Sequence, residues 1–252
     1  MSEFVEQIQF VELNMTGSNH TLTFPSNEPI VLGENAEIGL KSYMLWYVFP
    51  NISEKYENNI VKIKHNGEWK TVKIPDGMYE IDTLSRFLNR KILLGKDTLN
   101  LYENDPKSIL NLEVDKSTFH CIVQLDNGVE IDFTQGKLYQ LLGLEPKIYS
   151  TSERGKHFIN ITRNLDKLYI RCNLVDRKHQ YELRDVLYSI NPVAVPGEAI
   201  MAESDHPIEF YKCKNRVIRE INIRLTDANG MEIAYKENVN LKIALHHYVK
   251  VK

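Results

Sequence analysis

Two pairs of adjacent residues could do chemistry, His120-Cys121 and His246-His247. A cysteine beside a histidine suggests a thiol nucleophile with its base, and two histidines suggest a metal site. Both pairs fall in stretches that alternate apolar and polar residues. This alternation predicts strands, in which adjacent side chains point to opposite faces. We therefore expect a buried structural Cys121 and a solvated strand end at the two histidines. A thiol hydrolase, with a distant histidine folded against Cys121, stays open as an alternative.

Other catalytic and metal-binding motifs are missing from the sequence. It contains no glycine-rich phosphate loop, no Gly-x-Ser-x-Gly elbow and no zinc helix with paired histidines. Two segments, 126–128 and 227–230, resemble fragments of calcium loops but lack the closing glutamate, and turn formation explains both. We expect a protein without enzyme activity, and we predict no catalytic residue, no cofactor and no metal ion.

Composition and charge exclude several classes of partner. The 252 residues are 42% hydrophobic, with 31 basic and 34 acidic side chains and a net charge of −3. Such a balanced chain has no overall attraction for nucleic acid or anionic membranes, so neither is expected as a partner. No apolar run approaches the roughly 20 residues of a membrane span, and no export signal is visible. Three widely spaced cysteines indicate a reducing intracellular compartment, either cytoplasm or nucleus.

Charge is distributed unevenly along this balanced chain. Lys212, Lys214, Arg216 and Arg219 form a basic segment, which is either a solvated loop or one side of a contact between copies of the chain. Trp46 belongs to an aromatic stretch that is either core or interface. We take these five residues as candidate interface residues. The opposite side of the contact would be the acidic residues before Ile60: Glu3, Glu6, Glu12, Glu28, Glu34, Glu37, Glu54 and Glu57.

Alternation with a period of two residues dominates the sequence and predicts antiparallel strands. Asn-Gly steps at 66–67 and 229–230 predict tight turns between some of them. Helical spacing of apolar residues occurs at 82–94 and 137–142, and we expect loops at 177–185 and 192–205. The sum is an all-β sandwich with inserted hairpins and one or two short helices. Strands are expected at 10–14, 20–24, 37–48, 60–64, 69–73, 109–114, 118–125, 129–133, 167–175, 208–212, 221–225, 231–235 and 239–245.

Five segments, in this order and spacing, resemble a known family. They are Gly39–Ile52, Ile74–Ile81 leading into the helix at 82–91, Leu138–Leu144, Leu168–Asp176 and Ile221–Gly230. Together they are similar to the minor capsid, or penton, protein of Polinton (Maverick) elements and adintovirus-like viruses.

The resemblance implies a jelly-roll β-sandwich without enzyme activity or cofactor. It implies homopentamers at the fivefold vertices of an icosahedral shell, beside a double jelly-roll major capsid protein, and therefore a location in the virion. Residues 1–252 would form the jelly-roll capsid domain, with residues 74–106 as a helical insertion. The rival hypothesis is a monomeric β-sandwich that binds a carbohydrate or protein ligand, with Trp46 or Trp69 as its exposed aromatic residue.

Overall fold

The chain divides into two compact units, each with its own apolar core. The computed structural model describes residues 4–95, 107–162, 165–177, 183–203 and 208–250. Unit 1 comprises residues 1–49 and 164–252, and unit 2 comprises residues 50–163. Both units consist mainly of antiparallel strands, which confirms the expected all-β class.

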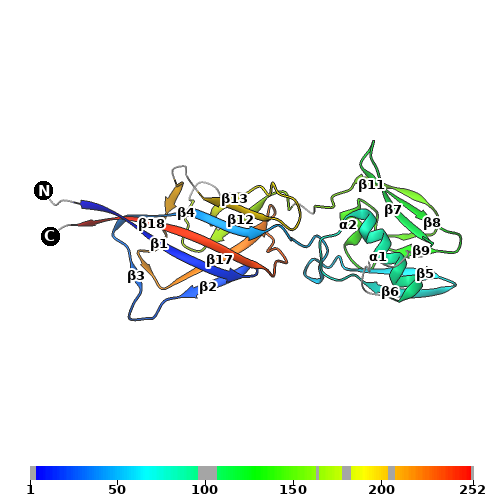
Figure 1. Ribbon diagram of the computed structural model, residues 1–252, viewed down its shortest axis with the longest axis horizontal. Helices are drawn as coiled ribbons and strands as arrows, with labels where there is room; N and C mark the ends of the chain where they lie inside the picture. Colours follow the sequence, from blue (N-terminus) through cyan, green and yellow to red (C-terminus); the bar gives the residue numbers. More distant parts are fainter. Residues whose placement is uncertain (1–3, 96–106, 163–164, 178–182, 204–207, 251–252) are drawn as a thin grey trace. The chain divides into compact units, whose positions relative to one another are not determined.

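Unit 1 contains two principal sheets. The first, sheet A, has the order β1-β18-β4-β14, and β15 also pairs with β4. Its strands are β1 (Phe4–Thr16), β4 (Glu34–Trp46), β14 (Ala199–Glu203), β15 (Phe210–Lys212) and β18 (Asn238–Lys250). The second, sheet B, has the order β13-β12-β17-β2, with β2 (Asn19–Thr23), β12 (Leu168–Cys172), β13 (Val186–Ile190) and β17 (Glu220–Asp227). A short pair, β3 (Ile30–Val31) with β16 (Val217–Ile218), lies outside both. Figure 1 shows β1, β18 and β4 side by side.

The strand order of unit 1 is that of a jelly roll. In its two sheets, β1 pairs with β18, β2 with β17, β4 with β14 and β15, and β12 with β13. These strands occupy eight positions along the chain when β14 and β15 are counted as one and the short β3–β16 pair is left out. The first strand therefore pairs with the last, the second with the seventh, and so on inward. This is the pattern of a long antiparallel ribbon rolled into two sheets, as in jelly rolls.

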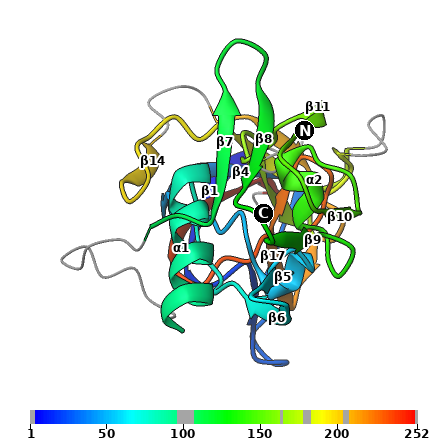
Figure 2. The same cartoon turned by 90° about the vertical axis from the view of Figure 1, so that its right-hand side faces the viewer.

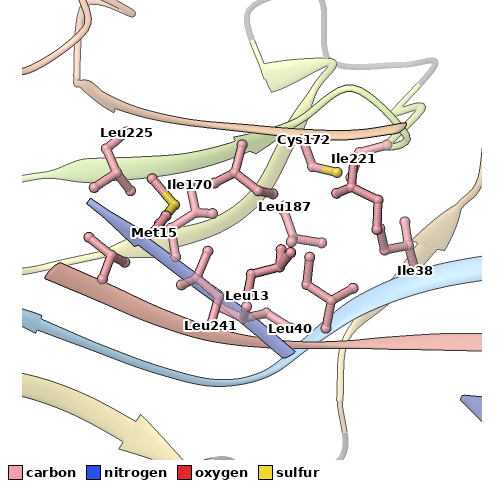
Figure 3. Close-up of a cluster of buried hydrophobic side chains, with 14 of the residues drawn as sticks. Leu13, Met15, Ile38, Leu40, Ile170, Cys172, Leu187, Ile221, Leu225 and Leu241 are labelled. Carbon is pink, nitrogen blue, oxygen red and sulfur yellow. The ribbon is translucent and has the colours of Figure 1, made fainter. Parts of the chain in front are cut away.

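The core of unit 1 fills the space between sheets A and B (Figure 3). Alternate residues of each strand point inward, so Leu13, Ile38 and Leu241 of sheet A face Ile170 and Ile221 of sheet B. All five side chains are almost fully buried. The alternation noted in the sequence thus corresponds to one buried face per strand, as expected for a sandwich.

Unit 2 is inserted between the third and fourth strands of the jelly roll, β4 and β12. It contains a four-stranded sheet of order β10-β9-β5-β6 and a three-stranded sheet of order β11-β8-β7. Asn66 and Gly67 have φ values of 53° and 83°, which is the geometry expected for their tight turn. The elements are β5 (Ile60–His65), β6 (Glu68–Lys73), α1 (Ile81–Leu94), β7 (Leu110–Asp115), β8 (His120–Leu125), β9 (Glu130–Asp132), α2 (Leu138–Leu142), β10 (Ile148–Tyr149), β11 (Glu153–Phe158) and a 3-10 turn at Glu54–Tyr56.

Helix α1 covers the open edge of β7 (Figure 2). Asn89 Nδ2 donates to the carbonyls of Ser85 and Leu110 at 2.8 and 2.6 Å, and its Oδ1 accepts from the N–H groups of Ile109 and Leu110 at 2.8 and 3.2 Å. Ser85 Oγ accepts from the N–H of Leu112 at 3.1 Å. Two side chains one turn apart on the helix therefore satisfy backbone groups that an edge strand would leave unpaired.

Several expectations differ from the structure. The segment 192–205, expected as a loop, contains β14, and the structure adds β11 and β13, which the alternation did not predict. Conversely, 231–235 forms only an isolated bridge between Thr226 and Glu232. The inserted unit is larger than the expected 74–106, because unit 2 comprises residues 50–163 and includes hairpins on both sides of α1. Residues 96–106 of the expected insertion lie outside the described residues.

Replacing Asn89 by alanine should destabilise unit 2 by about 2–4 kcal/mol, because it leaves buried backbone groups of β7 without partners. Denaturation can be followed by Trp69 fluorescence in a Trp46→Phe background, since Trp46 and Trp69 are the only tryptophans and Trp69 lies in unit 2. The control is Arg86→Ala on the exposed side of α1, with an expected change within about 0.5 kcal/mol. Equal effects of the two substitutions would contradict this role for Asn89.

Candidate functional site

The basic segment is a rigidly held surface of unit 1. Lys212, Lys214, Arg216 and Arg219 are all exposed, and none forms an ion pair with another described residue. Their main chain is anchored, because Lys214 N–H donates to Leu174 O, and the carbonyls of Arg216 and Arg219 accept from Leu32 and Phe24 N–H, each at 2.8 Å. The segment therefore presents four cationic side chains from a fixed backbone.

The acidic residues expected opposite this segment do not form one surface. Most of them pair within the chain, and Glu54 and Glu57 belong to unit 2. Glu3 lies outside the described residues. The pairs are Glu6 and Glu37 with His246, Glu12 with Lys242, Glu54 with Lys73 and Glu57 with Lys137. In unit 1, Glu6 and Glu12 are the acidic side chains of β1, and Glu28 and Glu34 are also exposed.

His246 and His247 are buried, so the expected solvated strand end is wrong. They are only 9% and 5% exposed. His246 Nδ1 lies 3.2 Å from Glu37 Oε2, and its Nε2 lies 2.9 Å from Glu6 Oε1. The contact with Glu6 is close enough for an ion pair, but its angle does not meet the requirement for a hydrogen bond. On the opposite face of β18, His247 Nδ1 accepts from the N–H of Gly33 at 3.1 Å. The two rings do point apart as expected, but each meets residues that are distant in sequence.

Trp46 lies at the other end of β4 from the basic segment. Lys212 pairs with Glu37, nine positions before Trp46 along β4, which corresponds to about 30 Å. Tyr235 Oη accepts from the N–H of Trp46 at 2.8 Å and donates to its carbonyl at 3.1 Å, and the residue is 41% exposed. The structure therefore does not bring Trp46 together with the four basic residues. Trp69, the other candidate aromatic residue, is also 41% exposed but lies in unit 2.

The aromatic stretch that contains Trp46 is divided between core and surface by its alternation. Leu45 and Phe49 are fully buried, and the ring of Phe49 packs against Tyr235 at 5.2 Å between centroids. Trp46 and Val48 point the other way and are 41% and 36% exposed. The odd-numbered residues of this stretch thus face the core of unit 1, and Trp46 and Val48 are exposed at its surface.

The cysteines are buried in apolar surroundings. Cys121 and Cys172 are at most 1% exposed, and burial raises the pKa of each thiol to about 12. His120 lies on the opposite face of β8, where its ring packs against Phe158 and not against the Cys121 sulfur. A catalytic thiol requires a lowered pKa, so Cys121 has the properties of the expected structural cysteine.

A surface that sequence reasoning missed is the free edge of β1. Among the described residues, β1 pairs with β18 only, and its first seven residues are exposed on both faces. Phe4, Ile8 and Phe10 are 46%, 47% and 48% exposed. The signal was present in the sequence, because these residues have the opposite parity to Leu13 and Met15, which are buried.

Metal-binding clusters and membrane-spanning helices are both absent from the described residues. No three His, Cys, Asp or Glu side chains in the described ranges are grouped so that they could hold a metal ion. No helix within the part of the chain that the structure describes is long and apolar enough to cross a membrane.

Comparisons with known proteins give structural similarities but no match in sequence. No protein-family profile and no curated protein sequence matches the chain. Among solved structures, the chain is similar to the mavirus penton protein, with a TM-score of 0.45 and 11% sequence identity over 97% of this chain and 100% of the other. At this similarity the match assigns no family, and the function proposed below rests on the strand order and surfaces of the chain itself.

The state of the cysteines can be tested by labelling the folded protein. At pH 8 a thiol reagent should modify Cys213 at most, because Cys121 and Cys172 are buried. This pH is also about four units below the raised pKa values of both buried thiols, so roughly one in 10⁴ is a thiolate. In denaturant all three cysteines should react. Rapid labelling of Cys121 in the folded chain, read by peptide mass, would support the thiol hydrolase instead.

Proposed function

We propose that this protein is a structural capsid subunit that assembles with copies of itself and has no enzyme activity. The observation that carries the proposal is the jelly-roll order of unit 1 combined with an exposed apolar edge at β1. Jelly rolls are common in viral capsids, although the fold alone does not define a function. A soluble monomer rarely leaves a long edge strand with exposed aromatic residues, whereas a subunit covers such an edge on assembly.

The more specific proposal is a minor capsid, or penton, protein. Its copies would form homopentamers at the fivefold vertices of an icosahedral shell, in contact with a double jelly-roll major capsid protein, within virions of a Polinton-like or adintovirus-like element. The support is the order and spacing of the five sequence segments described above. Three of them contribute strands to the two-sheet sandwich of unit 1: Gly39–Ile52 supplies most of β4, Leu168–Asp176 supplies β12 and Ile221–Gly230 supplies most of β17.

Charge is expected to contribute to contacts between copies. The four side chains of the basic segment are exposed and lack an acidic partner among the described residues, so a neighbouring copy can pair with them at low desolvation cost. The acidic side chains of unit 1 that remain accessible at the surface, including Glu28 and Glu34, are available for this contact. A contact between two different patches can close a ring of copies.

Reversing three of these charges, as Lys214→Glu, Arg216→Glu and Arg219→Glu, should weaken self-association without unfolding the chain. Exposed ion pairs contribute about 0.2–1 kcal/mol each, so we expect a loss of roughly tenfold or more in the association constant. Light scattering over a concentration series measures the assembly, and thermal unfolding checks the fold.

The matched control reverses three exposed basic residues of unit 2, Lys70, Arg86 and Lys116. It has the same change in net charge, so it separates a local contact from general repulsion. Equal assembly of the two triple variants would count against the basic segment as an interface. A wild-type chain that stays monomeric at all concentrations, alone and with a major capsid protein, would contradict the proposed function.

A further inference from the structure

The outer face of the three-stranded sheet in unit 2 is uncovered among the described residues. In this sheet β8 is the middle strand, between β7 and β11. Leu112, Cys121 and Val123 are almost fully buried on the inner face, so residues of the opposite parity point outward. An antiparallel sheet can leave one face to water, so the side chains on this face, and not its exposure, decide whether it binds a ligand. The outward residues, all exposed or half-buried, are Asn111, Glu113, Asp115, His120, Ile122, Gln124, Arg154 and Phe158.

One end of this face carries two exposed phenylalanines. Phe158 lies opposite His120 in the pairing of β11 with β8, and the centroids of their two rings are 5.0 Å apart. Phe119, which precedes His120 in the β7–β8 hairpin, is 62% exposed, and Phe158 is 70% exposed. Aromatic rings exposed in this way offer an apolar surface on which the flat face of a ligand can stack.

The hairpin holds Phe119 in a conformation that a phenylalanine adopts only at an energetic cost. Its φ is 54°, in the left-handed region that glycine and asparagine tolerate best. The N–H of Phe119 donates to the carbonyl of Asp115 at 2.7 Å, and its carbonyl accepts from the N–H of Ile159 at 2.9 Å, so the backbone is fixed on both sides. A glycine would fit this turn better, and the folding of the hairpin therefore does not explain an exposed phenylalanine here.

The other end of the face carries planar polar side chains that are linked to one another. Asn111 Nδ2 donates to Gln124 Oε1 at 3.2 Å, and Ser85 Oγ of α1 donates to Asn111 Oδ1 at 3.2 Å. Gln124 Nε2 lies 3.5 Å from Glu113 Oε2. Amide and carboxylate groups can bond to hydroxyl groups both as donors and as acceptors. Their contacts with one another hold these side chains in place before a ligand binds, which lowers the entropy cost of binding.

A hollow of about 530 Å³ adjoins this polar end of the face. It lies between α1 and the β7–β8 hairpin, and both Asn111 and Gln124 line it. Arg86 and Asp126 also line the hollow, and neither side chain has a hydrogen-bond or ion-pair partner among the described residues. The volume is within the range of small-ligand sites. Asn111 and Asp115 are four residues apart on β7, about 13 Å, so one short oligomeric ligand can span the hollow and the aromatic end.

The charges of this surface are mixed, and they indicate the class of ligand. Its acidic side chains include Glu113, Asp115 and Asp126, and its basic side chains include Arg86 and Arg154. A nucleic acid or another polyanion requires a clear excess of basic side chains, which this surface lacks. An uncharged ligand rich in hydroxyl groups can bond to the donors and the acceptors alike, and the apolar faces of its rings can stack on the exposed phenylalanines.

We propose that this face of unit 2, from the hollow to Phe119 and Phe158, binds a neutral carbohydrate. Sugar rings stack on the two phenylalanines, and sugar hydroxyl groups bond to the linked amide and carboxylate side chains. The inference goes beyond the proposed function, because the strand order and the self-association of unit 1 do not require it. The aromatic residues also differ from Trp46 and Trp69, the residues that the sequence suggests for a carbohydrate ligand.

Isothermal titration calorimetry of the full chain tests the proposal. The neutral probes are maltohexaose, cellohexaose and chitohexaose, and the anionic probes are a heparin oligosaccharide and single-stranded oligothymidylate. We expect at least one neutral probe to bind with a Kd of about 1 mM or lower, as for an open and shallow site. Phe158→Ala should weaken this binding about tenfold through the loss of stacking. Gln124→Ala should weaken it about fivefold through the loss of hydrogen bonds.

The matched control is Trp69→Ala, which removes another exposed aromatic ring of unit 2, on β6 of the other sheet. It should leave the affinity unchanged. Phe158→Tyr keeps an aromatic ring at the site and should retain most of the affinity. Thermal unfolding confirms that each variant is folded, so a loss of binding in Phe158→Ala alone supports the proposed face.

Three results would overturn the proposal. The first is that no neutral probe binds at about 10 mM, well above the expected Kd. The second is that only the anionic probes bind, which would indicate a polyanion site. The third is a neutral probe whose binding is lost in Trp69→Ala and retained in Phe158→Ala, which would place the site elsewhere. None of these results bears on the proposed capsid role, which self-association tests.

Discussion

An open β-sheet leaves a row of backbone N–H and C=O groups unpaired at each edge, and this constraint organises both units of the protein. Unit 2 satisfies the edge of β7 with side chains of a helix. Asn89 of α1 accepts from the N–H groups of Ile109 and Leu110, and Ser85 accepts from the N–H of Leu112. In unit 1 the outer side of β15 is partly covered by main chain, because the N–H of Asp176 donates to the carbonyl of Lys212 and the N–H of Lys214 donates to the carbonyl of Leu174. The edge at β1 has no such cover among the described residues.

The two edges differ in how their backbone groups are satisfied. The edge of β7 is satisfied within the chain, whereas the edge of β1 is unpaired among the described residues. Burying Asn89 beside β7 costs the desolvation of an amide, and four hydrogen bonds offset that cost. At β1 the chain instead exposes Phe4, Ile8 and Phe10 on an unpaired strand, which is an aggregation hazard for a monomer. The hazard disappears if the edge is paired in the working assembly, and this reasoning connects the local geometry of β1 to a self-assembling subunit.

The sequence predicts those strands whose burial is one-sided. Ile221, Ile223 and Leu225 are fully buried in β17 as their spacing predicts, and the helix at 81–94 follows its apolar face. The missed strands have weak or no alternation. Only one of the six residues of β11 is buried, Gly155, and β14 is short and follows a Pro- and Gly-containing turn. Such edge strands are held by pairing with a partner strand, which a local pattern does not reveal.

The same limit applies to the candidate surface. The basic segment was visible as a charge run, but its grouping with Trp46 was not supported, since position along β4 separates Trp46 from Lys212 by about 30 Å. The ring of His246 lies beside Glu6 and Glu37, which are more than two hundred residues away in the chain. These contacts are determined by the registers between strands that are distant in sequence. They cannot be predicted until the pairing of the first strand with the last is known.

The jelly-roll order also explains how the chain accommodates unit 2. No pairing within unit 1 uses the segment between β4 and β12, so both sheets are complete without it. The cost of closing a longer connection grows only logarithmically with its length, and a large insertion at this point is therefore tolerated. Trp46, where the chain leaves β4, lies at the opposite end of that strand from the row of Ile8, Glu37 and Lys212. The strand registers of the sandwich are thus set within unit 1, without a contribution from the inserted unit.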